Sequence, residues 1–291
     1  MSNLKEHINV NIRFQRSTRI DSDLDLDGEF FNGFVFHGTA ENTLRTIAEG
    51  YQQSNRKTYT VTGPYGTGKS TVALLLAGLL SSNNNLRSVA SDVVKSEFSE
   101  LFYKKIPVEN GWFVVKSVCS FESPITALWT SIIAEADVHN IDVSHIPRPL
   151  DEKSFFTAFN KVTKLVEKSL DGIVILFDEM GKSLEFLNSQ HLDLQFFQDF
   201  AEKMARKEFP VLFLGFLHQA FAEYARGQSQ SVKEGWAKVQ VVIQIYCLMF
   251  LKMKQSHLLA IASFKNLLIN LIARLLRVLS KHWKRPGSRS L

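Results

Sequence analysis

Apolar and polar residues form two kinds of segment along the chain, and these segments alternate. Short runs of β-branched, aromatic and aliphatic residues predict buried strands at 57–62, 112–118, 173–177 and 211–217. Longer segments with apolar residues on one face predict helices at 39–53, 70–80, 124–137, 152–169 and 190–207. Strands that alternate with helices predict an α/β fold with a mostly parallel central sheet flanked by helices.

The same pattern divides the chain into three parts. Residues 1–33 have no clear periodicity and predict an irregular N-terminal lead-in. Residues 34–240 contain the alternating elements and form the expected domain. Residues 241–291 are apolar and basic and contain no acidic residue, so we expect a separate C-terminal tail, for which a helix is one interpretation.

Charge is distributed unevenly between these parts. The net charge of the 291 residues is +5, with 45% hydrophobic and 22% charged residues, a composition typical of a globular protein and not of a disordered one. Residues 1–234 hold 24 Lys and Arg against all 29 Asp and Glu, a net charge of −5. Residues 235–291 hold ten Lys and Arg and no acid, a net charge of +10. The predicted domain therefore lacks the basic footprint of a general nucleic-acid binder.

The location of the protein is predicted from its cysteines and apolar runs. Cys119 and Cys247 form no paired framework and no metal-ligand spacing, so we expect reduced thiols. The first ten residues lack the apolar core of a secretory signal. The run at 239–251 is too short for a membrane span, and polar residues interrupt the run at 258–279. We therefore expect a cytoplasmic protein with no membrane span.

A glycine-rich loop follows the first predicted strand and precedes an apolar helix. Its eight residues are Gly63, Pro64, Tyr65, Gly66, Thr67, Gly68, Lys69 and Ser70, which match the Walker A pattern G-x-x-x-x-G-K-[ST]. The glycines let successive backbone N–H groups face phosphate oxygens, and the helix presents its positive end to the same anion. Lys69 would contact the β- and γ-phosphates, Ser70 would ligate Mg²⁺, and Thr71 would be a further phosphate contact.

Two acidic residues follow the third predicted strand, in the form of a Walker B motif. Asp178 ends the apolar run at 173–177 and would hold Mg²⁺, usually through water. Glu179 is placed to act as the base for the attacking water. Ligands of open α/β sheets bind beyond the carboxyl ends of the strands, so both motifs are expected to face one nucleotide. The sequence contains no Asn-Lys-x-Asp stretch, the motif that recognises guanine, and this favours ATP over GTP.

Two further parts of an ATPase site have weaker signals. His218 or Gln219 follows the fourth strand, where either could contact the γ-phosphate or the water; capping of a helix that starts near Ala220 is the alternative. Arg206 and Arg226 are the nearest candidates in sequence for an arginine finger, although neither belongs to a specific motif. An arginine from a neighbouring subunit is an equal alternative, and we expect a homo-oligomer.

Several of these stretches resemble a known family. Residues 36–39, 63–70, 177–182 and 215–221 are similar to AAA-type P-loop ATP-binding proteins of bacterial genome-defence (antiviral) loci. The resemblance implies an AAA/ASCE-like P-loop NTPase that drives or licenses an effector acting on nucleic acid, with other proteins of the same locus as partners. It also implies further sequence after residue 240 that carries the rest of the sheet and an all-helical region.

The tail departs from that resemblance, because the chain turns apolar and basic after about residue 240. One interpretation is a basic amphipathic helix that lies on an anionic membrane or on DNA. The favoured interpretation is a frame-shift or truncation near residue 240, because native composition rarely changes so abruptly.

Three functions are compatible with the sequence. The first is Mg-dependent ATP binding and hydrolysis that serves a nucleic-acid-directed complex, which would make the protein an ATPase. The second is a nucleotide-dependent assembly switch or scaffold with slow hydrolysis. The third is a truncated remnant of such an ATPase.

Overall fold

The computed structural model describes residues 18–24, 28–32, 34–54, 56–192, 194–224 and 244–247. Arg226, most of the predicted lead-in and most of the predicted tail lie outside these residues. Within the described residues, no helix has the length and apolar character needed to cross a membrane.

Five parallel strands form one sheet in the order β2-β3-β4-β1-β5. The strands are β1 (Thr58–Thr62), β2 (Trp112–Val118), β3 (Gly172–Asp178), β4 (Val211–Leu217) and β5 (Gln244–Cys247). The α/β class, the parallel sheet and the four predicted strands are confirmed. β5 pairs with β1 and begins after residue 240, so the sheet extends past the expected end of the domain.

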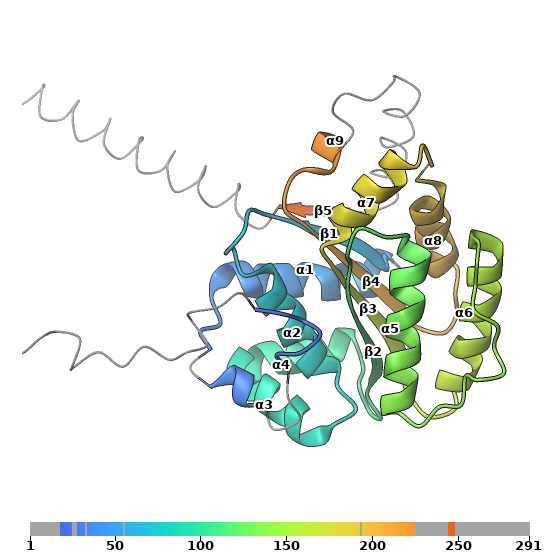
Figure 1. Ribbon diagram of the computed structural model, residues 1–291. Helices are drawn as coiled ribbons and strands as arrows, with labels where there is room; N and C mark the ends of the chain where they lie inside the picture. The colour runs from blue at the N-terminus through green and yellow to red at the C-terminus, as the bar shows by residue number, and fades with distance from the viewer. Residues whose placement is uncertain are drawn as a thin grey trace, which may run out of the picture. The chain divides into compact units, whose positions relative to one another are not determined.

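Helices connect the strands and cover both faces of the sheet (Figure 1). They are α1 (Gly38–Ser54), α2 (Lys69–Leu80), α3 (Asn84–Val94), α4 (Ser96–Lys105), α5 (Pro124–Val138), α6 (Glu152–Val166), α7 (Met180–Ser189), α8 (Gln195–Ala205) and α9 (Phe221–Tyr224), with a 3₁₀ turn η3 (Glu29–Phe31). The sequence did not predict α3, α4 or α7, and the helix expected at 190–207 begins only at Gln195.

Alternate residues of each central strand enter different halves of the core, which explains the continuous apolar runs. In β3, Ile173, Ile175 and Phe177 pack with side chains of α5, α6 and α8. Val174 and Leu176 point the other way and pack with side chains of α1 to α4. Each face of the sheet is therefore covered by its own helical layer.

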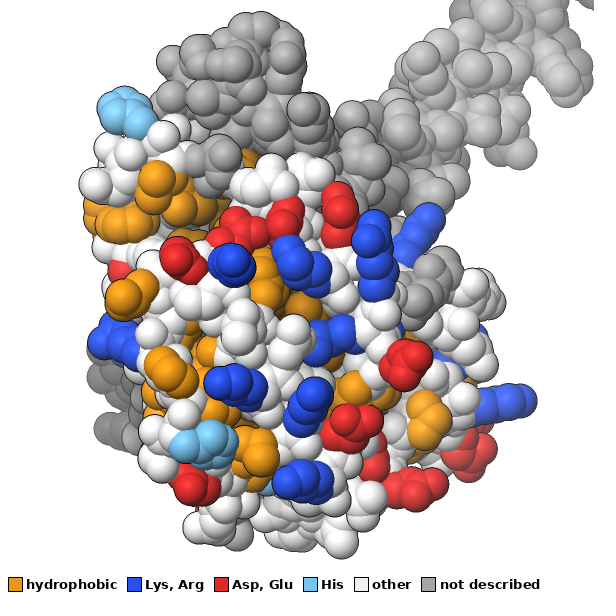
Figure 2. Space-filling view, turned by 90° about the vertical axis from the view of Figure 1, so that its right-hand side faces the viewer, with side chains coloured by type: hydrophobic (Ala, Val, Ile, Leu, Met, Phe, Trp, Pro, Cys, Tyr) orange, Lys and Arg blue, Asp and Glu red, His pale blue; other side chains and the backbone are white. Residues whose placement is uncertain are grey.

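The outer surface of one helical layer carries charges of both signs. Figure 2 shows Lys and Arg side chains spread over this face, with Asp and Glu side chains among them and around them. The mixture agrees with the net negative charge of residues 1–234. This face does not form a continuous basic surface of the kind that binds nucleic acid through charge alone.

All the predicted functional motifs lie at one edge of the sheet. Because the strands are parallel, their carboxyl ends meet there, and the residues that follow each strand become neighbours. The glycine-rich loop follows β1, Asp178 and Glu179 end β3, and His218 follows β4. β4 lies between β1 and β3, so His218 lies between the other two motifs.

Candidate functional site

A cavity of about 790 Å³ opens at this carboxyl edge. Its walls come from the glycine-rich loop with the first turn of α2, the ends of β2, β3 and β4, the first turn of α7 and residues near Arg19. The sequence predicted the loop, Asp178, Glu179 and His218 as site residues, and all of these except Gly63 and Pro64 line the cavity. Gly63 and Pro64 contribute through their carbonyl groups, which hold Lys69.

The loop can curl only because glycine occupies two positions with left-handed backbone. Gly66 has φ +75° and Gly68 has φ +85°, a region that favours glycine. The Thr67 hydroxyl donates a 2.9 Å hydrogen bond to the Pro64 carbonyl, which closes the turn. The Gly63 N–H donates to the Leu217 carbonyl at 3.0 Å and ties the loop to β4. The loop thus leads directly into α2, with Gly68 as its N-cap.

Lys69 is a buried cation held by the loop itself. Its Nζ donates to the carbonyls of Gly63 at 2.7 Å and Pro64 at 3.0 Å, and lies 3.2 Å from Nδ1 of His218. Burial lowers the pKa of Lys69, while the charges of Asp178 and Glu179 act to raise it. An anion entering the loop would therefore meet a cation that can exchange backbone carbonyls for phosphate oxygens.

Ser70 and Asp178 form a pair that could hold a divalent cation. The Ser70 hydroxyl donates to Oδ2 of Asp178 at 2.9 Å, across 108 residues of sequence. Burial raises the pKa of Asp178, against hydrogen bonds from Ser70 and from the Glu179 N–H that lower it. A hydroxyl and one carboxylate fit Mg²⁺, which takes few protein ligands and completes its shell with water and phosphate. No cluster of three or more His, Cys, Asp or Glu side chains with metal-binding geometry occurs in the described residues.

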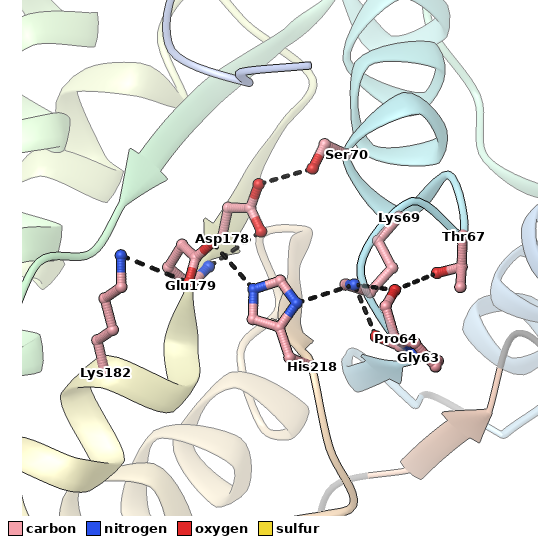
Figure 3. Close-up of polar contacts among 9 residues, drawn as sticks. All are labelled: Gly63, Pro64, Thr67, Lys69, Ser70, Asp178, Glu179, Lys182 and His218. Atoms are coloured by element: carbon pink, nitrogen blue, oxygen red, sulfur yellow. Dashed lines mark hydrogen bonds and ion pairs between the residues drawn. The ribbon is translucent and has the colours of Figure 1, made fainter. Parts of the chain in front are cut away.

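Glu179 is held between two positively polarised groups (Figure 3). Its backbone is left-handed, with φ 54°, at the N-cap of α7. Oε1 lies 2.9 Å from Nε2 of His218, and Oε2 lies 3.5 Å from Nζ of Lys182. A carboxylate on the wall of a cavity is placed to take a proton from a molecule bound there.

His218 connects the two motifs through its ring. The Lys69 ammonium can only donate, so Nδ1 of His218 accepts and the ring proton belongs on Nε2, where it is donated to Glu179. The ring of Tyr65 stacks on His218 with centroids 3.7 Å apart and fixes the imidazole from one side. Gln219 is exposed and does not line the cavity. In the part of the chain that the structure describes, the His218 ring nitrogens contact Lys69 and Glu179 and do not cap α9.

Arg206, one of the two candidate arginines, lies away from the cavity. This residue is the C-cap of α8 and is 83% exposed, a few residues before the amino end of β4. The residue after Arg206 is Lys207, and its carbonyl accepts a 2.6 Å hydrogen bond from Nζ of Lys57, which precedes β1. Arg206 therefore lies at the opposite edge of the sheet from the cavity and cannot reach it within the same chain. Arg226 lies outside the described residues.

Two cations of the cavity wall were not identified from the sequence. Lys182 is three residues after Glu179 on α7, and the available signals were this i,i+3 spacing and its place at the end of the stretch 177–182. Arg19 makes a two-point ion pair with Asp21, with contacts of 3.1 and 2.7 Å. The neighbouring Ile20 is fully buried in the core, which anchors this short segment. No sequence pattern pointed to Arg19.

The stretches at 177–182 and 215–221 also have a structural role. A Cβ atom at Gly215 would collide with Sδ of the buried Met180. A Cβ atom at Gly181 would collide with the hydroxyl of Tyr224. The two glycines therefore allow α7 to approach β4 and α9 closely, which sets the position of Glu179 against His218.

A scan against protein-family models found no matching family, and a search of the curated proteins found no match. The function of the chain is therefore inferred from its own residues. These are a glycine-rich strand–loop–helix turn, a hydroxyl–carboxylate pair and a carboxylate–imidazole contact, all around one cavity.

Proposed function

We propose that the chain binds Mg-ATP in the 790 Å³ cavity and hydrolyses it. The observation that carries the proposal is the convergence of Lys69, Ser70, Asp178, Glu179 and His218. These residues lie at or after the ends of three strands that are distant in sequence. Lys69 contacts His218, His218 contacts Glu179, and the Glu179 N–H donates to Asp178, which accepts from Ser70. Each supplies one chemical part that phosphoryl transfer to water requires.

The glycine-rich loop would bind the phosphates. Its backbone N–H groups and the amino end of α2 attract anions, and α2 is long enough to present a helix dipole. Lys69 would leave the carbonyls of Gly63 and Pro64 and contact phosphate oxygens instead. Thr71 lines the cavity one residue after Ser70 and would add a further contact.

Ser70 and Asp178 would hold the magnesium ion. They already share a hydrogen bond, so both oxygens face the same point at the cavity wall. When bound, the ion would neutralise charge on the β- and γ-phosphates. A bound cation would also favour the ionised form of Asp178, whose pKa is raised by burial in the free protein.

Glu179 would act on the attacking water. The water oxygen bonds to the γ-phosphorus, the bond to the β–γ bridging oxygen breaks, and the water proton passes to the Glu179 carboxylate. His218 would keep that carboxylate oriented through the 2.9 Å contact with Oε1. The products are ADP and inorganic phosphate.

The role of this hydrolysis in a nucleic-acid-directed, antiviral complex rests on the resemblance of 177–182 and 215–221 alone. Partner proteins and a homo-oligomer belong to the same proposal. The net charge of −5 in residues 1–234 gives DNA no general attraction to this part of the chain. Any response to DNA is therefore expected to be specific to a partner or a local contact.

A nucleotide-dependent switch is the second candidate. One observation favours it: in the free protein Lys69 is bound by two carbonyls and His218, and Glu179 is bound by His218 and Lys182. A phosphate group that entered the loop would have to exchange these contacts, and this exchange would couple nucleotide binding to a rearrangement of the chain. The size of the protein in solution, measured with and without Mg-ATP, tests this candidate, and an unchanged size would argue against it.

The main proposal is tested by steady-state ATP hydrolysis with the purified chain, with and without double-stranded DNA. Lys69→Ala should lose binding and turnover, whereas Glu179→Gln should lose turnover and keep nucleotide binding. Lys203→Ala, on the outer surface of α8, serves as a control and should behave as the unaltered chain. Turnover that persists in Glu179→Gln would remove Glu179 as the base, and turnover that persists in Lys69→Ala would refute the site.

A further inference from the structure

Lys182 occupies an unusual place for a cation. It lies in the first turn of α7, where its N–H donates to the Glu179 carbonyl at 2.9 Å. The positive end of a helix dipole disfavours a cation there. The side chain is 47% exposed and lines the cavity. A negatively charged group that contacts Lys182 would therefore be stabilised both by the lysine and by the amino end of α7.

The contact of Lys182 with Glu179 is loose and replaceable. Nζ lies 3.5 Å from Oε2, longer than a good charge-assisted hydrogen bond of about 2.7–2.9 Å. Glu179 keeps its second partner, His218, on the other carboxylate oxygen at 2.9 Å. Figure 3 shows Lys182 and His218 on opposite sides of the Glu179 carboxylate. Lys182 can thus leave Glu179 without leaving that carboxylate unpaired.

The other two cations of the cavity wall have closer partners than Lys182 has. Of the described residues, Lys69, Lys182 and Arg19 are the Lys and Arg side chains that line it. Lys69 is buried under the loop, and Arg19 is held by Asp21 through two contacts. Lys182 is the one whose ion pair is both long and half exposed to solvent.

We propose that Lys182 supplies, within the same chain, a second positive charge, in addition to Lys69, that contacts the terminal phosphate of the nucleotide. This inference rests on the proposed function. On binding, the ammonium exchanges Oε2 of Glu179 for an oxygen of the γ-phosphate and stabilises charge there during transfer. The same movement leaves Glu179 held only by His218, with Oε2 available to the attacking water. ADP has no γ-phosphate, so it leaves the Lys182–Glu179 pair intact.

Two substitutions of Lys182 distinguish the effect of its charge from the effect of its side-chain length. Lys182→Met keeps most of the length of the side chain and removes the charge, whereas Lys182→Arg keeps the charge. Lys203→Met is the matched control, because Lys203 is 46% exposed and pairs with Asp199 one turn away on α8, outside the cavity.

We expect Lys182→Met to lower kcat by about 100-fold, the loss typical of removing one group that stabilises transition-state charge. Its Kd for a non-hydrolysable ATP analogue should rise about tenfold, in line with the loss of one charge-assisted hydrogen bond. Its Kd for ADP should stay unchanged, which also shows that the cavity is folded. Lys182→Arg should recover most of kcat, and Lys203→Met should match the unaltered chain.

The outcomes separate this inference from the proposal on which it rests. Unchanged kcat and an unchanged ATP-to-ADP affinity ratio in Lys182→Met would overturn the inference alone, provided that Lys69→Ala loses binding and Glu179→Gln loses turnover. Failure of the unaltered chain to bind Mg-ATP would overturn both. Turnover restored by mixing Lys182→Met with Lys69→Ala would place the lysine in a neighbouring chain's site and overturn its action within one chain.

Discussion

Asp178 illustrates a conflict between stability and function at a single residue. Its carboxyl group is buried, and burial raises its pKa above the ordinary value of 3.8. A raised pKa in the folded state means that folding favours the protonated form. The free protein therefore loses stability as the pH rises above 3.8 and the carboxyl group ionises.

Asp178→Asn should remove this loss and keep both contacts, because the amide oxygen can accept from the Glu179 N–H and the amide NH2 can donate to the Ser70 hydroxyl. We expect the free variant to melt about 2–4 °C above the unaltered chain at pH 7, a shift that corresponds to roughly 1 kcal/mol for a chain of this size. The difference should shrink as the pH falls towards 4. Calorimetry across that range measures it, and a lower melting temperature for the variant at pH 7 would contradict this expectation.

Cys119 is a cavity-wall residue that should be chemically inert. Its thiol is buried and contacts the Ser183 hydroxyl at 2.9 Å, and burial raises its pKa to about 11. Little thiolate then exists at pH 8. Iodoacetamide should leave Cys119 unmodified in the native protein and modify it after denaturation, as peptide mass mapping would show. Rapid native labelling at this residue would mean that the cavity wall opens.

The sequence predicted which single residues gather at the cavity better than it predicted the partners of those residues. Lys69, Ser70, Asp178 and Glu179 were predicted because each belongs to a short motif with a physical reason behind its spacing. Arg19 and the stacking of Tyr65 on His218 depend on contacts between distant segments. Periodicity and spacing carry no information about such contacts.

Among the elements, α7 determines the geometry of the site. It begins at Met180, immediately after Glu179, and packs against β4 through the glycine at 215. No Ser, Thr, Asp or Asn caps its start, because a left-handed glutamate holds the N-cap position. The usual start signal is therefore missing, which explains why the sequence did not predict this helix.

Gly215→Ala should disturb α7, because the added methyl group meets Met180 Sδ. We expect a loss of about 1–3 kcal/mol in the free energy of unfolding, typical of an overpacked core. Urea denaturation measures this loss. Adding Met180→Ala should cost less in the Gly215→Ala background than in the unaltered chain, since the clash is then relieved. Strictly additive losses would show that the two residues do not interact.

The architecture of the whole molecule bears on the hypothesis that the chain is a truncated remnant of an ATPase. The described residues form a sheet with a closed core on each face, and the sheet includes a strand that lies past residue 240. A packed core of this kind argues against a decayed remnant.

The order of the strands in the sheet could not be predicted from the sequence, because pairing depends on long-range packing. Residues 244–247 were also assigned to the tail, because composition changes there while the parallel pairing with β1 leaves no local mark.

A folded nucleotide site should respond to its ligand by mass action. Mg-ATP at about 100 times its Kd should stabilise the chain by roughly 2.7 kcal/mol and raise its melting temperature. A thermal-shift measurement should show a single cooperative transition that moves with Mg-ATP, and no movement in Lys69→Ala. A broad, ligand-independent transition would favour a decayed remnant.

The place of β1 in the sheet has a consequence for biosynthesis. Both neighbours of β1, which are β4 and β5, come later in the chain; Thr58 pairs with Phe213 and Tyr59 with Gln244. While the ribosome is still making the middle of the protein, β1 has no strand to pair with. The apolar helix α2, which follows β1, also lacks the side chains of β4 that share its core. The proposed nucleotide site is also incomplete at these early stages, so the apolar surface of the nascent chain stays exposed until β4 has been made.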